Sequence, residues 1–354
     1  MRIVSPLLKR VVYPSLSSMG MFHRSTARGL AVVTYHGVLP SGYEPIDPAS
    51  DGNLITAETL RRQLRLLKTH YDVVSPDDVL GWLQGGELPA RAVLLTCDDG
   101  LLNHLTDMLP VLQQEGVKCL FFVTAASAGE EREMLWYEDL LLLFLFAAEG
   151  PLEVSRGAIE IRSELGSREQ RRALWWDCVK RLSQLDAEAR CAFVAAIREQ
   201  IGPSSWRGLD RADPVAYRRF GLMTCGELRQ LVVAGMTIGA HTVSHPVLSQ
   251  VATELAFAEI AESRKRLEGF LQQPVWAFAY PFGDAQSVTA QVLQLAEQAG
   301  FKAAFLNYGG GLGAELPRFA LPRVHVTSDM SLGELEAHVS GFYARLRRLS
   351  VGGM

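Results

Sequence analysis

Short apolar runs alternate with longer amphipathic segments along most of this 354-residue chain. The runs are rich in aliphatic and β-branched residues, which is typical of strands buried on both faces. The predicted strands are 28–38, 91–100, 118–124, the stretch before 242, 275–283 and 302–306. The predicted helices between them are 56–71, 102–116, 224–234, 253–271 and 288–300. Strands that alternate with helices predict an α/β fold in which helices cover a parallel sheet.

The alternation is interrupted between residues 127 and 215. This stretch is charged and its pattern indicates helices joined by loops, so we expect a helical insertion between two parts of one scaffold, 28–126 and 216–330. The amphipathic segment 331–354 predicts a C-terminal helix. In residues 1–27 apolar residues alternate with basic ones, which predicts a helix that either packs on the domain or lies peripherally on a membrane.

Composition narrows the function classes. The chain is 48% hydrophobic, enough for a sizeable core, and its net charge is −4. One short basic run, RLRRL near the C-terminus, is too little to indicate nucleic acid as a partner. The five cysteines are scattered and lack metal-site spacing, which favours free thiols in a reducing compartment. Without a signal-peptide pattern we expect a cytoplasmic protein, with the inner membrane face as an option; the pattern indicates no oligomeric state.

Two adjacent aspartates, Asp98 and Asp99, end the predicted strand 91–100. Neighbouring carboxylates repel one another unless water or a cation lies close to them. A solvated Asp-Asp-Gly turn is a common loop composition and explains the pair by itself. Alternatively, because adjacent residues at a strand end point in different directions, one carboxylate binds a metal while the other acts as a general base.

Two histidines at helical spacing supply the remaining ligands of such a site. His241 follows a predicted strand directly, and His245 is four residues later, so a helical turn would place both imidazoles on one face. Pro246 should open that turn at His245. Two structural histidines would explain the spacing alone equally well. Together with a strand-end carboxylate, they favour a divalent metal, Zn²⁺ first, with Co²⁺, Mn²⁺ or Fe²⁺ as alternatives.

A third strand end, FAYPFGD at 278–284, leads into a proline-glycine turn. Backbone N–H groups of such a turn can form an oxyanion hole, although an ordinary strand-to-turn transition explains the pattern as well. TCDDG, HTVSHP and AYPFG, in this order and with TYHGV and MLWYEDL elsewhere in the chain, resemble the polysaccharide deacetylases, which share the NodB homology domain. The resemblance covers about 30–126 and 221–330.

The resemblance implies a distorted (β/α) barrel and metal-dependent hydrolysis of N-acetyl groups on sugars such as N-acetylglucosamine. It implies that Asp98 is the general base and that the backbone N–H of Phe282 stabilises the oxyanion. It also implies that the metal ligands are Asp99, His241 and His245.

The chain departs from the family pattern at several positions. Cys97 replaces the usual phenylalanine of the first motif and is expected to pack behind the site. Ala279 replaces an arginine that orients the general base, and Arg323 in LPRVHV is the expected substitute. His325 is the nearest candidate for the general acid. The tryptophan-containing fourth motif is not found.

The sequence therefore predicts a hydrolase that removes N-acetyl groups from an N-acetylhexosamine glycan or its precursor, as in exopolysaccharide biosynthesis. The candidate glycan-binding residues are Tyr280, His36 and Trp136. Two alternatives remain open at this point. One is a carbohydrate-binding or scaffold protein that lacks a complete acid/base set, and the other is a hydrolase of a non-sugar amide.

Overall fold

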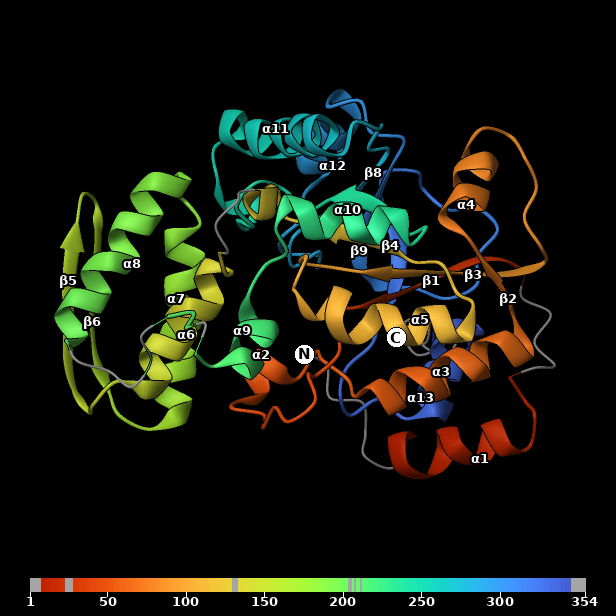
Figure 1. Ribbon diagram of the computed structural model, residues 1–354, viewed down its shortest axis with the longest axis horizontal. Helices are drawn as coiled ribbons and strands as arrows, with labels where there is room; N and C mark the ends of the chain where they lie inside the picture. Colours follow the sequence, from red (N-terminus) through yellow and green to blue (C-terminus); the bar gives the residue numbers. More distant parts are fainter. Residues whose placement is uncertain are drawn as a thin grey trace, which may run out of the picture.

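Parallel strands form a closed barrel at the centre of the molecule (Figure 1). The computed structural model describes residues 8–22, 28–128, 133–202, 206, 208–210 and 212–344. Around the barrel the strands follow the order β1, β3, β4, β7, β8, β9, β10, and β10 pairs with β1. Their bounds are β1 Gly29–Tyr35, β3 Arg91–Cys97, β4 Leu120–Val123, β7 Thr237–Ala240, β8 Ala277–Ala279, β9 Ala303–Gly309 and β10 Leu321–His325. The expected α/β barrel is confirmed.

The two edges of β3 place the aspartates at the rim of this barrel. One edge pairs with β1 along its whole length. The other edge pairs first with β2 (Asp72–Val74) and then, through Thr96 and Cys97, with β4. Because β3 is hydrogen-bonded on both sides up to Cys97, its carboxyl end holds Asp98 and Asp99 between β1 and β4.

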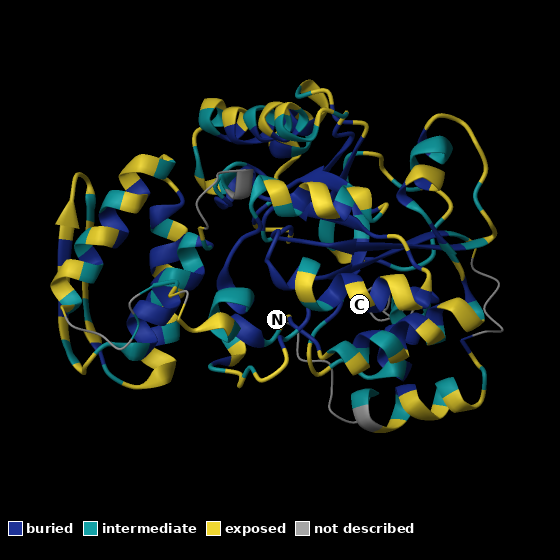
Figure 2. Cartoon of the chain, in the orientation of Figure 1, coloured by how far each residue is buried: buried dark blue, intermediate teal, exposed yellow. Residues whose placement is uncertain are grey.

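Helices cover the outside of the barrel, and the strands between them are almost entirely buried (Figure 2). The covering helices are α3 Ala57–His70, α4 Pro76–Leu83, α5 Leu109–Glu115, α10 Cys225–Val233, α11 Thr253–Leu271, α12 Ala290–Gln298 and α13 Leu332–Val339. Local sequence sets their boundaries: the hydroxyl of Thr56, for example, accepts the N–H of Thr59 at the start of α3. Helix α5 follows a π-helical turn, His104–Met108.

The inserted region is a separate lobe with its own apolar core (Figure 1). It contains α6 Trp136–Phe146, α7 Arg168–Leu182 and α8 Ala187–Ile201, and α9 (Pro214–Phe220) follows them without contributing to this core. It is not wholly helical as expected, because β5 (Gly150–Arg156) and β6 (Ile159–Leu165) form an antiparallel hairpin. Apolar residues alternate with polar ones in both strands, so one face packs on the helices and the other is solvated.

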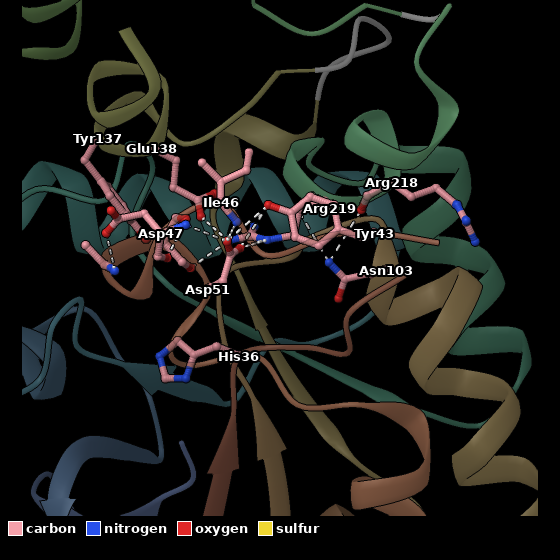
Figure 3. Close-up of polar contacts among 12 residues, drawn as sticks. His36, Tyr43, Ile46, Asp47, Asp51, Asn103, Tyr137, Glu138, Arg218 and Arg219 are labelled. Atoms are coloured by element: carbon pink, nitrogen blue, oxygen red, sulfur yellow. Dashed lines mark hydrogen bonds and ion pairs between the residues drawn. The ribbon is translucent and has the colours of Figure 1, made fainter. Parts of the chain in front are cut away.

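The segment between β1 and α3 ties this lobe to the barrel. Asp47 caps the short helix α2 (Pro48–Asp51) and accepts ion pairs from Arg168 and Arg172 of α7. Arg219 at the end of α9 is completely buried and lies between two carboxylates, Asp51 and Glu138, at 2.9 Å from each (Figure 3).

This buried cluster joins α2, α6 and α9. Arg219 also donates to the carbonyl of Ser50 at 2.7 Å, and the hydroxyl of Tyr43 donates to Asp51 at 3.1 Å. Burial opposes the charge of Arg219, but Glu138 and Asp51 outweigh it and raise its pKa. For Glu138 burial outweighs Arg219 and raises the pKa to about 7. The cluster therefore fixes the start of α6 against the barrel.

The N-terminal segment packs on the barrel's last helix. A short π-helical stretch (Leu8–Val12) leads into α1 (Tyr13–Ser18), and Tyr13 is buried together with Phe22 and Ala337 of α13. The alternative of peripheral membrane association stays a prediction. Within the described residues, every helix is too short or too polar to cross a bilayer. The basic run near the C-terminus lies outside the described residues.

Candidate active site

Asp99, His241 and His245 form a compact cluster at the rim of the barrel. The Nε2 atom of His241 lies 3.6 Å from Oδ1 of Asp99, and that of His245 lies 3.4 Å from the same oxygen. One potential ligand atom from each residue lies within 4.8 Å of the others, and all three residues are buried. Burial raises the pKa of Asp99, but the two neighbouring histidines outweigh it and hold the pKa well below its usual range.

The two histidines lie in one cluster, as their spacing predicts, but the expectation that a helical turn holds them is wrong. Residues 241–247 form a loop after β7. Thr242 and His245 both have positive φ, 65° and 55°, and the hydroxyl of Thr242 accepts the His245 N–H at 3.0 Å. Pro246 disfavours helical geometry at His245. The loop directs both imidazoles toward Asp99 without a helical turn.

Backbone strain is concentrated at this rim. The described chain has five non-glycine residues with positive φ, and four of them are Asp99, Thr242, His245 and Phe282. Such conformations cost on the order of 1–3 kcal/mol each and persist where the surrounding structure enforces them. Their gathering around one cavity is typical of a functional site.

Contacts from three helices hold the histidine loop. The Glu259 carboxylate on α11 accepts the N–H groups of Val243 and Ser244 at 2.9 and 2.8 Å. Arg190 on α8 donates to the hydroxyl of Ser244 at 2.5 Å. The indole of Trp136 on α6 donates to the carbonyl of His245 at 3.3 Å. The inserted lobe thus supports a loop that belongs to the barrel.

Arg323 takes the place that the sequence suggested for it, beside Asp98. Its guanidinium spans both carboxylate oxygens of Asp98 at 2.7 and 2.5 Å and also donates to the hydroxyl of Thr96 and the carbonyl of Leu306. Both charged side chains are buried. Burial raises the pKa of Asp98, but Arg323 and then His241 outweigh it, so the pKa is lowered and the carboxylate is ionised.

These groups lie in a cavity of about 500 Å³. The residues lining it include the following: His36, Asp98, Asp99, Tyr137, Glu138, Trp175, Trp176, His241, His245, Phe282, Asp284, Asn307 and His325. None of the described lining residues is Lys or Arg. The Phe282 N–H has no hydrogen-bond partner among the described residues, so it is available to a ligand.

His36 and His325 face one another in the cavity wall. Their ring centroids are 4.8 Å apart, and both side chains contain a buried nitrogen without a partner in the described chain. Burial, reinforced by His36, lowers the pKa of His325 to about 3. His325 is therefore neutral near pH 7 in this structure. His104, in contrast, is a buried structural residue that contacts the carbonyl of His36 and Cys97.

Two expected glycan contacts are corrected by the structure. Tyr280 is 0% exposed, does not line the cavity, and donates its hydroxyl to the carbonyl of Phe319 at 2.9 Å. Trp136 lies behind the histidine loop, with Arg190 stacked over its ring, and lines a different cavity. A side chain committed to the core or to loop support does not present its ring to a ligand.

The three-residue cluster fits a divalent metal. Ligands bound at about 2.0–2.1 Å to a tetrahedral ion are roughly 3.3 Å apart, close to the observed contacts between Asp99 and the two histidines. The Nδ1–H of His241 can donate to the carbonyl of Ala279 at 2.7 Å, which leaves Nε2 as the ligand atom. Ala279, which replaces the expected arginine, thus contributes through its backbone.

Comparisons with known proteins agree with this geometry. The polysaccharide deacetylase family model matches residues 85–156 and 205–304, which contain both aspartates, both histidines and Phe282. Over these two stretches, just under half of its length, the chain is similar to the polysaccharide deacetylase family. A curated relative, the putative polysaccharide deacetylase YxkH of Bacillus subtilis, is 25% identical over 117 residues. That alignment covers 33% of this chain and 41% of the relative, so the chain spans about two-fifths of its length.

Solved structures share the fold. The Streptococcus pyogenes deacetylase PplD, in complex with acetate, has a TM-score of 0.54 at 18% identity, covering 89% of this chain and 99% of that one. IcaB from Ammonifex degensii has a TM-score of 0.55 at 20% identity, covering 88% and 97%. At these identities the likeness concerns the fold.

Part of the cavity wall lies outside the family match. Residues 157–204 are unmatched, and they include Trp175 and Trp176 of α7. Trp175 donates to the carbonyl of Tyr137 at 2.7 Å, while Trp176 is 37% exposed. Neither tryptophan was predicted as a site residue. Two adjacent tryptophans in a charged helix were the available signal, but their neighbours in the cavity come from distant parts of the chain.

Proposed function

We propose that this chain hydrolyses N-acetyl groups on a glycan of N-acetylhexosamine units, or on its precursor, with the help of a divalent metal. The observation that carries the proposal is the buried Asp98–Arg323 pair beside the Asp99, His241 and His245 cluster, in one cavity of a deacetylase-family barrel. An ionised carboxylate next to a metal-ligand set is the arrangement that amide hydrolysis by activated water requires.

Asp99, His241 and His245 would hold the metal, with Zn²⁺ as the first candidate and Co²⁺, Mn²⁺ or Fe²⁺ as alternatives. A divalent ion in such a site supplies Lewis-acid polarisation of the acetyl carbonyl and makes water more acidic. The contact of His241 Nδ1 with the carbonyl of Ala279 suits this role, because an Nδ1–H that donates there leaves Nε2 to bind the ion.

Asp98 accepts a proton from the attacking water, whose oxygen bonds to the acetyl carbon. Arg323 orients both carboxylate oxygens during this transfer. The backbone N–H of Phe282 donates to the oxyanion that develops on the acetyl oxygen. The carbon–nitrogen bond then breaks, acetate forms, and the sugar nitrogen takes a proton to leave as an amine.

We assign His325 a role in the final proton transfer that differs from the expected general acid. Because its pKa is held at about 3, the imidazole carries no proton for the amine before the reaction. The proton therefore originates from the water and reaches the amine from Asp98, with His325 and His36 lining its route. For the cellular setting we retain the proposal of a cytoplasmic enzyme that modifies a glycan precursor.

The test is acetate release from N-acetylglucosamine oligomers, measured together with the free amines formed. Asp98→Asn should lower the rate at least about 100-fold because the base is lost. Asp177→Asn, at an exposed position on α7, is the matched control and should retain the rate. Equal activity of Asp98→Asn and the unmodified protein would contradict the proposal. Hydrolysis of other amides but of no acetylated sugar would favour the non-sugar alternative, and binding without hydrolysis would favour a carbohydrate-binding protein.

A further inference from the structure

A row of aromatic rings leads outward from the metal-ligand cluster. The ring of Phe282 lies 5.0 Å, centroid to centroid, from His245, and Trp176 lies 5.7 Å from Phe282. Tyr137 contacts both His245 and Phe282, at 4.9 and 5.8 Å. Trp175 continues the row, 5.6 Å from Trp176. The row therefore connects the barrel rim to helix α7 of the inserted lobe.

Trp176 is the exposed member of this row. With 37% of its surface exposed, it belongs to the few large apolar side chains of the described chain that reach solvent to that extent. Trp175 uses its indole N–H to hold the backbone of Tyr137, whereas no hydrogen bond of the Trp176 indole is found in the described residues. Lys180 lies over the Trp176 ring at 5.5 Å and, one turn along α7, supports its orientation. An exposed indole costs stability unless a ligand covers it.

The charged groups that line the cavity restrict which ligands can stack on the Trp176 ring. Its described lining contains four carboxylates, Asp98, Asp99, Glu138 and Asp284, and no Lys or Arg side chain. The described lining offers no Lys or Arg side chain to pair with an anionic group, whereas its carboxylate oxygens can accept hydrogen bonds from hydroxyls. A neutral pyranose fits both features, because its C–H face packs on an indole while its hydroxyls donate to acidic and carbonyl oxygens.

We propose that Trp176 is the stacking platform for a second sugar ring, next to the sugar that loses its acetyl group, so that the site prefers glycans of two or more neutral sugars over a single one. The inference rests on the proposed deacetylase function, and it adds a specificity-determining residue from the part of the chain that the family model does not match. In this proposal the inserted lobe gives the site its preference for glycans of two or more sugars.

The experiment measures binding separately from turnover. Calorimetric titration of the Asp98→Asn protein with N-acetylglucosamine and its tetramer gives the length preference as a ratio of dissociation constants. We expect the tetramer to bind about tenfold more tightly, which is the range of one aromatic stacking contact. Trp176→Ala, in the same background, should reduce the ratio to near one without weakening monosaccharide binding, and Trp176→Phe should give an intermediate ratio. Trp82→Ala, on α4 and outside the cavity lining, is the matched control and should keep the ratio.

The outcomes separate this inference from the proposed function. A length preference that persists in Trp176→Ala would overturn the inference, and so would the absence of binding of both sugars to the Asp98→Asn protein. If the unmodified chain releases no acetate but binding still depends on length through Trp176, the proposed function fails while the second sugar site stands.

Discussion

The two walls of the cavity differ in chemistry and in origin. The barrel wall supplies charged groups and candidate metal ligands from the ends of β3, β7 and β10, and buried hydrogen bonds fix Asp98 and His241 among them. The lobe wall supplies aromatic rings from α6 and α7, and the most accessible of them, Trp176, is held by ring packing and by its contact with Lys180. This contrast fits the proposed division of the site, with bond breaking at the barrel rim and ligand selection on the inserted lobe.

The largest expected effect is a loss of acetate release when Arg323 in the barrel wall is replaced. Arg323→Met leaves the buried Asp98 carboxylate without its bidentate partner, which raises the pKa of Asp98 and misorients the base. Acetate release should fall roughly 100- to 10,000-fold, the range of general-base catalysis. Steady-state kinetics at fixed protein concentration check this. A loss below tenfold would show that Asp98 does not depend on Arg323.

A loss of folding stability is expected when Arg219, which links the lobe to the barrel, is replaced. Arg219→Met leaves two buried carboxylates, Asp51 and Glu138, without a counter-charge. Breaking such a pair costs about 3–5 kcal/mol, so the unfolding midpoint in urea should fall clearly. Glycan affinity should fall as well, because α6 and the rings beside it lose their support. Arg218→Met, whose guanidinium is part-exposed and pairs with Asp107, is the control and should cost under 1 kcal/mol.

The smallest effect concerns acid stability, where the two regions should respond with opposite sign. Burial lowers the pKa of His104 in the barrel to about 4, against about 6.5 when unfolded. The unfolded state then binds more protons, so the barrel loses stability as the pH falls from 6.5 toward 4, by on the order of 3 kcal/mol for this residue. Burial raises the pKa of Glu138 in α6 to about 7, above its unfolded value, so protonation there adds stability as the pH falls below 7.

Hydrogen exchange measured between pH 7 and pH 4.5 separates the two responses. The inserted region 127–215 contains no histidine, so barrel strands should lose protection before α6 and α7 do. Loss of protection in the lobe first would contradict this assignment.

The difference between the walls also explains what could be predicted from the sequence. Asp98, Asp99 and His241 follow apolar strands directly and His245 lies four residues after His241, so parallel-strand geometry predicts that they meet. Arg323 was predicted as the partner of Asp98 and lies there. The helical turn at His241 was wrong because Thr242 and His245 adopt positive φ, which local spacing does not reveal.

The lobe wall was harder to predict. The β5–β6 hairpin has a period-two pattern around Gly157, which was the signal that could have identified it. The cluster of Asp51, Glu138 and Arg219 joins residues up to 168 positions apart, and no spacing rule predicts such contacts. Tyr280 was predicted as a glycan contact, but alternation along the strand end turns its ring into the core.

The most direct test of the central claim is the metal content of the purified protein, measured by elemental analysis after removal and return of divalent ions. The account predicts one ion per chain, lost in His241→Ala and retained in His70→Ala, a histidine on α3 outside the cavity. One ion in all three proteins, or none in the unmodified chain, would contradict the assignment of Asp99, His241 and His245 as a metal site.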